Sequence, residues 1–428
     1  MIKKIIEGEY ILYIIASIIP LLTISIFIAD LIYSLLAIIF LIYLITNNFR
    51  LDYKNTFFLT SITFYFVCVI SSTLSDDLFF SLKSSLPLLR VFLFIFLLSF
   101  FISFNKNLID IFYNFFLITF SILSLYGFSQ YIYEYNDLLK MDSLATRNIR
   151  LSLFFSDEKK VGSFLVRLYG LFLALHIIKK NKSNFQNIFF IIVTLLSSIV
   201  ILLSGERASL FFMIMFFLSC LVLLNIKFKI KLICLSLISI SFFILLFLNS
   251  NLSNRIIFYK NNQFNFSKDK IIIFTMQHTA HYKAAAKMFL DKPYLGHGPK
   301  MFRILCSDKK YYSLVLAETG DEFTSCSSHP HNTYLQLLAE TGLVGTSIFS
   351  LGFFYITYTL FKHFFMIALY RKRNLTDYQI ILSVTVLITF WPFSPAGNVF
   401  NNWLLIVYSL PLSFYVNEFF GYKKFSKS

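Results

Sequence analysis

Long apolar runs recur along almost the whole chain, separated by short polar or charged connections. A run of roughly 18 or more mostly apolar residues is typical of a helix that crosses a membrane. The pattern therefore predicts about twelve spans, over residues 10–29, 31–47, 56–74, 85–103, 108–131, 162–178, 186–203, 207–225, 231–249, 334–362, 377–393 and 401–418. The first connection, at Asp30, is so short that the first two spans are expected to form a tight helical hairpin.

Two longer segments interrupt this pattern, one over residues 131–160 and one over residues 250–333. The second has roughly 85 residues, which is too long for a simple connection. Within it, the good helix formers between Thr279 and Leu290 predict a short helix. We expect an all-α polytopic membrane protein with one integral membrane domain. Nine spans lie in residues 1–249, the large loop in 250–333 and three spans in 334–428.

Composition and charge agree with this organisation. Hydrophobic residues make up 57% of the chain and charged residues 14%, about half the charged share of soluble domains. The formal net charge of +16 comes mostly from short Lys and Arg clusters in alternate connections. That distribution follows the positive-inside rule and needs no nucleic-acid partner. It places both termini in the cytoplasm and the large loop on the periplasmic side. The first apolar run is long enough to be a span rather than a cleaved signal.

The five cysteines fit the same topology. Cys68, Cys220 and Cys234 lie within expected spans, where thiols act as small apolar side chains. Cys306 and Cys326 share the large loop and are expected to form a disulfide if that loop faces an oxidising periplasm. The alternative is two unrelated free thiols.

The stretch HPHNTYLQLLAETGLVG, residues 329–345, concentrates polar side chains at the outer end of the tenth span. Asn332 is suited to cap the helix that follows, and unpaired N–H groups at a helix N-terminus favour an anion. Gly342 and Gly345 are expected to break or thin this helix before it enters the membrane. His329 and His331 are then candidate site residues. The alternative is an interfacial cap with incidental histidines.

Several cations are further candidates. Arg207, in SGERASLFF, stands at the outer mouth of a span, where a charge marks a ligand pathway or anchors the helix at the interface. Arg167 and Arg90 lie in the outer parts of their spans, where they could line the same cavity or pair with carboxylates. In the large loop the weaker candidates are Arg255, His278, His281 and Arg303. No spacing of His, Cys, Asp or Glu suggests a metal site, so no metal or other cofactor is expected.

These motifs resemble one family of bacterial envelope proteins, the O-antigen ligase and O-antigen polymerase superfamily. HPHNTYLQLLAETGLVG is similar to its loop signature, and AAAKMFLDKPYLGHGPKMF resembles the helix and glycine-rich turn that precede it. SGERASLFF and VGSFLVRLYGLFLAL resemble two supporting motifs. The likeness covers roughly the C-terminal two thirds of the chain. One departure is His278, which stands where family members often have an arginine.

The resemblance implies a metal-independent glycosyltransferase of the inner membrane. Such an enzyme takes a glycan from a polyprenyl diphosphate carrier at the periplasmic face and passes it to lipid A-core or to another carrier-linked repeat. It implies that His331 acts on the acceptor hydroxyl and that Arg207 holds the diphosphate. A second cation would come from His278, Arg255 or Arg303. His329, Asn332 and Arg167 are expected to contact substrate, and Glu340 to order the loop.

Other functions remain open at this stage. Ligation to lipid A-core ranks slightly ahead of repeat-unit polymerisation and protein O-glycosylation, because no additional soluble acceptor-binding domain is apparent. A lipid-linked oligosaccharide transporter is less favoured, since transporters place ionisable residues near the bilayer midplane. Here these residues gather at one face. A structural or assembly protein would tolerate the loss of His331.

Overall fold

The computed structural model describes residues 8–46, 55–140, 150–155, 158–227, 229, 231, 266–267, 270–271, 275–316 and 322–421. The membrane-domain helices are α2 (Tyr10–Ile24), α3 (Ile26–Thr46), α4 (Thr56–Thr73), α5 (Leu78–Ser85), η1 (Leu86–Leu88), α6 (Leu89–Phe104), α7 (Asn107–Lys140), α8 (Val161–Ile178), α9 (Asn184–Leu203), α10 (Arg207–Leu223), α15 (Thr333–Tyr370), α16 (Asp377–Thr389) and α17 (Asn402–Phe420). The elements of the large loop are β1 (Phe266–Ser267), β2 (Lys270–Ile271), α13 (Met276–Asp291), α14 (Phe302–Leu305), β3 (Leu314–Leu316) and β4 (Glu322–Thr324).

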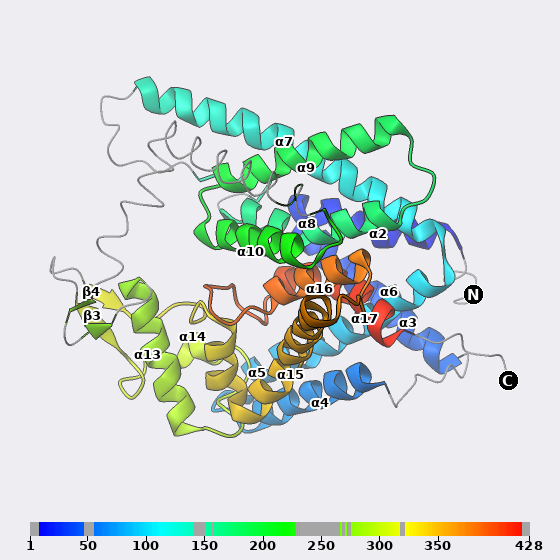
Figure 1. The fold of residues 1–428 in the computed structure, drawn as a ribbon. Coiled ribbons are helices and arrows are strands. Elements are labelled where there is room, and N and C mark those ends of the chain that lie inside the picture. The colour runs from blue at the N-terminus through cyan, green and yellow to red at the C-terminus, as the bar shows by residue number, and fades with distance from the viewer. Residues whose placement is uncertain are drawn as a thin grey trace.

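The helices lie side by side, and the elements of the large loop gather at one end of the bundle (Figure 1). In the bundle α17 packs against α6, α16 against α8, and α7 against α9. At the loop end, α13 packs against α15 and against the antiparallel β3–β4 pair. The start of α2 and the end of α17 lie at the opposite end of the bundle from this loop (Figure 1).

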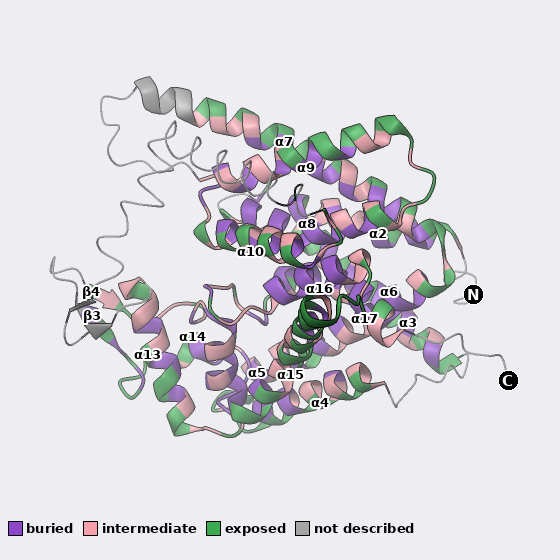
Figure 2. Cartoon of the chain, in the orientation of Figure 1, coloured by how far each residue is buried: buried purple, intermediate pink, exposed green. Residues whose placement is uncertain are grey.

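The described helices have the length and composition of membrane spans. Eight are apolar and long enough to cross a bilayer, and α2, α10 and α16 are shorter apolar helices. Exposed residues lie along the helices of the bundle (Figure 2). Many exposed side chains are apolar, among them Phe27 and Phe185, about three quarters exposed. Such surfaces are stable against lipid rather than water. The prediction of an all-α polytopic membrane protein is confirmed. The expected span over residues 231–249 lies almost wholly outside the described residues.

Some predicted boundaries were wrong. The first two helices meet at Ser25, not at Asp30, which lies inside α3. The tenth expected span is longer than predicted, because α15 continues to Tyr370. Gly342 kinks this helix, with φ 63° and ψ −165°, whereas Gly345 remains helical. Local apolar pattern does not reveal these differences, because a single extended residue such as Ser25 can separate two helices within one apolar run.

An ion pair near the predicted outer end of the bundle explains why Asp30 is tolerated within a helix. The guanidinium of Arg90 on α6 lies 2.9 Å from the Asp30 carboxylate and donates to Ser34 Oγ at 2.5 Å. Asn402, at the start of α17, donates to the same carboxylate at 3.0 Å. Polar side chains in lipid are stable when they satisfy one another between helices. The sequence allowed Arg90 either to line a cavity or to pair with a carboxylate, and the structure shows the pair with Asp30.

The kink of α15 is held by backbone hydrogen bonds to the glycine-rich turn after α13. His297 N–H donates to Ala339 O at 3.0 Å, and Gly298 N–H donates to Glu340 O at 2.8 Å. Just past the kink, Leu343 N–H donates to Pro293 O at 2.8 Å. This backbone pairing, between residues 293–298 and 339–344, fixes the large loop against the first segment of α15. The orphan backbone groups of a broken helix are thereby satisfied.

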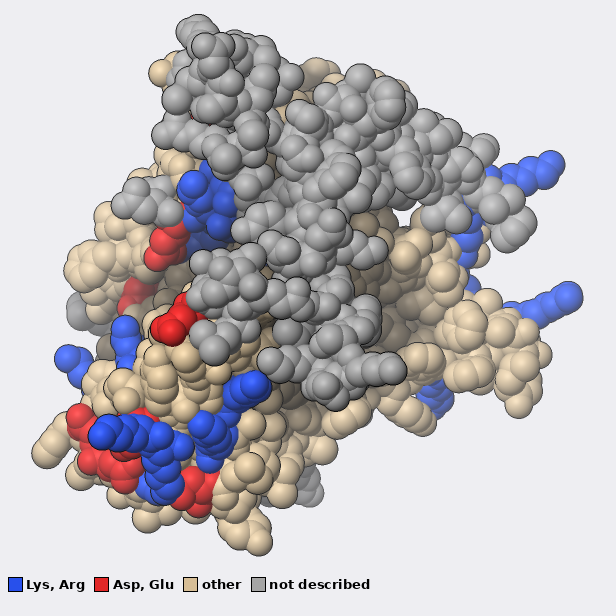
Figure 3. Space-filling view, turned by 90° about the vertical axis from the view of Figure 1, so that its left-hand side faces the viewer, with Lys and Arg blue, Asp and Glu red and all other residues tan. Residues whose placement is uncertain are grey.

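At the loop end, Cys306 and Cys326 form a disulfide. It joins the residue after α14 to the segment that follows β4. Basic and acidic side chains both appear on this end of the molecule (Figure 3). Two loop lysines are paired: Lys292 lies 3.0 Å from Asp76, and Lys310 lies 2.5 Å from Asp291. Each of these two lysines therefore has its charge balanced by a carboxylate.

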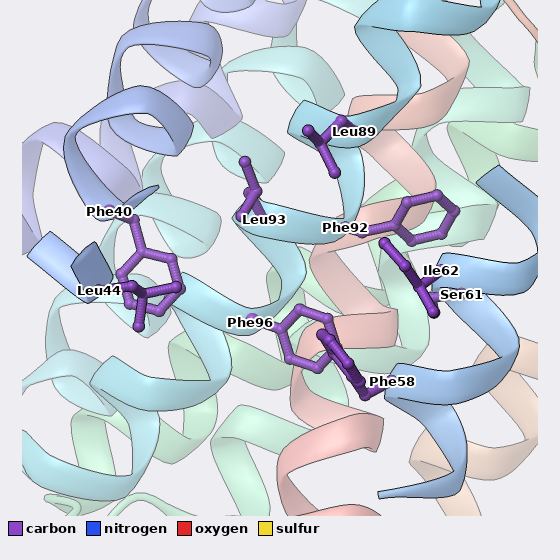
Figure 4. A pocket seen from close by; sticks show the side chains of 9 residues that line it. All are labelled: Phe40, Leu44, Phe58, Ser61, Ile62, Leu89, Phe92, Leu93 and Phe96. Carbon is purple, nitrogen blue, oxygen red and sulfur yellow. The ribbon is translucent and has the colours of Figure 1, made fainter. Parts of the chain in front are cut away.

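An apolar recess lies within the bundle between α3, α4 and α6 (Figure 4). Its lining is Phe40, Leu44, Phe58, Ser61, Ile62, Leu89, Phe92, Leu93 and Phe96. Eight of these nine side chains are hydrocarbon, so the recess suits a hydrocarbon chain rather than a polar group. None of the candidate site residues contributes to it.

Replacing Gly342 by alanine is expected to destabilise the loop end of the fold. A Cβ at this position would lie 2.5 Å from Leu295 N and closer still to the carbonyl of Tyr294. The backbone conformation also belongs to a region that only glycine adopts readily, at a cost of roughly 1–3 kcal/mol for other residues. The apparent Tm of the purified protein in detergent should fall by several degrees, together with its folded yield.

Gly352→Ala is the matched control, because this glycine lies in the same helix and a Cβ there meets nothing within 4 Å. It should leave the Tm unchanged or raise it slightly. An equal Tm for Gly342→Ala and Gly352→Ala would contradict the role assigned to the kink.

Candidate functional site

Four histidines meet where α13 approaches the start of α15. His278 and His281 stand three residues apart on α13 and share one face of that helix. His329 and His331 come from the loop that leads into α15. The ring centre of His331 lies 5.3 Å from that of His278, 5.4 Å from His281 and 4.2 Å from His329. His331 is therefore the central member of this histidine cluster.

The loop that carries His329 and His331 is fixed by hydrogen bonds to the segment before α17. His331 O accepts from Ala396 N–H at 2.9 Å. Ala396 O accepts from His329 Nε2 at 3.2 Å, so this nitrogen carries the proton. The other ring nitrogen of His329, Nδ1, then accepts from Ser328 Oγ at 2.8 Å. His331 has a φ of 58°, a left-handed conformation that is uncommon for residues with a Cβ.

Asn332 caps α15 with its side chain. Its Oδ1 accepts from the N–H groups of Tyr334 and Leu335, both at 3.0 Å, and its Nδ2 donates to Pro392 O at 2.8 Å. These contacts occupy both ends of the amide. The structure thus gives the side chain of Asn332 a capping task at the start of α15, and its contact with substrate stays a prediction.

Burial keeps the histidine cluster neutral. Burial lowers the pKa of His331 to about 4, with a smaller contribution from the charge that His281 carries when it is protonated. Burial also lowers the pKa values of His278 and His329 to about 4, with contributions from the other histidines. A neutral imidazole has a lone pair available near neutral pH, so these side chains can accept protons there.

Arg207 starts α10 and lies close enough to the cluster for its charge to lower the pKa of His278. The residue before it has a separate, structural task. The carboxylate of Glu206 accepts from the N–H groups of Gly162 and Ser163 at 2.7 and 3.0 Å, and from Ser209 Oγ at 3.0 Å. It thereby caps α8 and fixes the start of α8 against the start of α10. The SGER motif thus combines a helix cap with a cation near the histidines.

The structure does not bring all predicted cations to the histidine cluster. Arg167 is 4% exposed, donates to Ser163 O at 3.2 Å and to Ser163 Oγ, and lies between the rings of Phe212 and Tyr408. Arg303 is exposed on α14, near Lys300, whose pKa it lowers in addition to the larger effect of burial. Arg255 lies outside the described residues. Of the two choices for the second cation that the structure describes, His278 and Arg303, His278 is the one whose ring lies next to His331.

Glu340 is fully buried and ties the large loop to α15. Its carboxylate accepts from Phe302 N–H and from Gln336 Nε2, both at 3.0 Å. Gln336 in turn donates to Asn398 Oδ1 at 2.9 Å and accepts from Val399 N–H at 3.0 Å. Gly342 and Gly345 follow on the same helix. Through this network Glu340 holds the large loop against the first segment of α15.

The sequence analysis named His281 as a weak candidate but gave it no role. Its ring is completely buried, and its Nδ1 lies 2.7 Å from Ser325 O, beside the Cys306–Cys326 disulfide. The spacing HTAH, which puts His278 and His281 on one helix face, was the available signal. Within the described residues, no group of three or more His, Cys, Asp or Glu side chains is arranged to hold a metal ion.

Comparison with known proteins gives one match. Residues 192–350 match the family model described as O-antigen ligase. This segment begins within α9 and includes Arg207, α13, the histidine cluster and the kink of α15. No curated protein matches the chain. The match confirms the resemblance read from the motifs: over residues 192–350 the chain is similar to the O-antigen ligase family.

Proposed function

We propose that this protein transfers a glycan from a polyprenyl diphosphate carrier to the lipid A-core at the periplasmic face of the inner membrane. The observation that carries the proposal is His331, a buried histidine with a lowered pKa at the centre of the cluster and within the family segment. Its neighbour His278 is close enough to Arg207 for that charge to contribute to its lowered pKa, after the larger effect of burial. Because the cluster lies at the loop end of an apolar bundle, both lipid-linked substrates can reach it with their tails still in the bilayer (Figure 1).

The transfer breaks one bond and forms another at the same sugar carbon. As the acceptor oxygen bonds to the anomeric carbon, the bond from that carbon to the diphosphate oxygen breaks, and the diphosphate leaves with the electron pair. His331 takes the proton from the acceptor hydroxyl as this bond forms. Such general base catalysis typically contributes around 10²- to 10⁴-fold.

Arg207 acts on the leaving group. The departing diphosphate gains negative charge, and a guanidinium can donate two parallel hydrogen bonds to phosphate oxygens. A donor already placed where the charge develops stabilises the transition state without reorganisation. His278 lies between Arg207 and His331 in this proposal, so it is suited to donate to the diphosphate once the anion raises its pKa. No metal is required for either step.

The first prediction concerns His331 and Arg207. In proteoliposomes that contain the purified protein, carrier-linked glycan and lipid A-core, His331→Ala should lower kcat by about 10²- to 10⁴-fold. Arg207→Ala should lower it by roughly 10²- to 10³-fold, as loss of one placed donor does elsewhere. The measurement is the rate of appearance of glycosylated lipid A-core at matched amounts of folded protein.

Lys372→Ala is the control, because this exposed cation follows α15 at the end remote from the histidines. It should transfer glycan at the wild-type rate. Wild-type rates for both His331→Ala and Arg207→Ala would overturn the proposed function. A wild-type product in which repeats are joined on the carrier, with lipid A-core unmodified, would identify a polymerase instead.

The second prediction concerns pH. The pKa of His331 in the free protein is about 4, below the ordinary value of 6.5, so the neutral base is present above pH 4 and is lost as pH falls below it. The acid limb of kcat/KM, which reports the free enzyme, should therefore have its midpoint well below pH 6. A midpoint at pH 6.5 or higher would show that the active base is not a buried histidine of this kind.

A further inference from the structure

His281 is held in one tautomer by the backbone. Ser325 O is an acceptor only, so the Nδ1 atom 2.7 Å away must carry the proton and donate it. In a neutral imidazole the other nitrogen is then a lone-pair acceptor. This Nε2 atom is buried and has no hydrogen-bond partner among the described residues. A buried acceptor without a partner costs about 1–3 kcal/mol, so its retention calls for a reason.

The neighbour that can use this lone pair is His331. Two imidazole rings joined end to end by an N–H···N hydrogen bond of about 2.9 Å have centres about 5.2 Å apart. The observed separation of the His281 and His331 ring centres is 5.4 Å, with 37° between the ring planes. A small rotation of either ring would therefore complete the bond.

The other two histidines of the cluster are less suited to this task. Both nitrogens of His329 already have partners, Ala396 O and Ser328 Oγ. The pKa of His278 is lowered mainly by burial and also by the nearby charge of Arg207. His281 is the member of the cluster whose ring has one nitrogen bound to the backbone and one unused acceptor.

We propose that His281 is a positioning residue for His331, accepting an N–H of His331 at Nε2 so that the other nitrogen of His331 faces the acceptor hydroxyl. The inference rests on the proposed function and adds a residue to it. When His331 takes the acceptor proton it becomes an imidazolium with two N–H groups. One of them is then shared with the His281 lone pair, and the proton leaves to water after the diphosphate has departed.

The charged and titratable groups around this pair are few. His278, on the same helix face as His281, and His329 lie against His331, and Arg207 lies beyond His278. All three histidines and His281 itself have lowered pKa values because of burial. In the described surroundings, His281 therefore meets His331 as a neutral acceptor.

The test compares two substitutions that separate the two nitrogens of His281. In His281→Asn, the amide N–H can keep the hydrogen bond to Ser325 O, but no atom replaces Nε2. In His281→Gln, the longer amide can present its oxygen near the former Nε2 position. His297→Asn is the matched control, since His297 is also a fully buried loop histidine bonded to a backbone carbonyl, Met288 O, yet contacts Tyr311 rather than the cluster.

The expected result is a loss of kcat without a loss of binding. In the proteoliposome assay, His281→Asn should lower kcat by roughly 10- to 100-fold, with the KM values for both lipid substrates changed less than threefold. This loss is smaller than the one that follows removal of a carboxylate orienting a histidine base, because a neutral ring is a weaker acceptor. His281→Gln should recover most of the rate, and His297→Asn should keep the wild-type kcat per folded molecule.

The pH dependence of the rate supplies a readout that a merely structural role would not move. Without the Nε2 acceptor the imidazolium of His331 is less stable, so the acid limb of kcat/KM should shift to lower pH in His281→Asn and return in His281→Gln. A kcat within twofold of wild type for His281→Asn, or equal losses in the Asn and Gln variants, would overturn the inference. Full activity of His331→Ala would contradict the proposed function itself. Loss of activity in His331→Ala together with an unchanged kcat in His281→Asn would contradict only the role of His281.

Discussion

The arrangement of the site depends on the backbone pairing between the glycine-rich turn and the kinked start of α15. These two segments come from different parts of the chain, and each would carry unsatisfied N–H and C=O groups if it stood alone. The pairing satisfies these groups and requires glycine at position 342, where φ is 63° and ψ is −165°. It also sets α13 against α15, which places His278 and His281 opposite His331.

Among the described residues, three buried or half-buried carboxylates near the membrane each have a partner from another element. Glu206 caps α8, Asp30 pairs with Arg90, and Glu340 bonds the loop through Phe302 N–H. Arg167 has aromatic rings and its own helix backbone as neighbours. Carboxylates thus hold helices together, and the histidine cluster is left as the neutral, polar region in which lone pairs are available.

Much of this organisation could be predicted from sequence, because a membrane requires long apolar helices. The charges in the connections predict on which side of the membrane each connection lies. The polar stretch at residues 329–345 and the arginine of SGERASLFF were identified for the same reason, as costly groups in an apolar chain. The helix break at Ser25 was missed because it lies inside an unbroken apolar run. His281 could be named but given no role, because Ser325 O and His331 are 44 and 50 residues away in the chain and are brought near by the loop fold.

The kink at Gly342 divides α15 into nine residues, Thr333–Thr341, that belong to the loop end, and a longer part that follows them toward Tyr370. Hydrogen bonds to Phe302, Asn398 and the glycine-rich turn hold the short part in place. The long part has many exposed apolar side chains, such as Phe354 and Phe361. In a bilayer these side chains need only be apolar enough to contact lipid chains. A substitution in the long part of α15 therefore changes a contact with hydrocarbon, whereas a substitution in the short part changes a contact that holds the large loop.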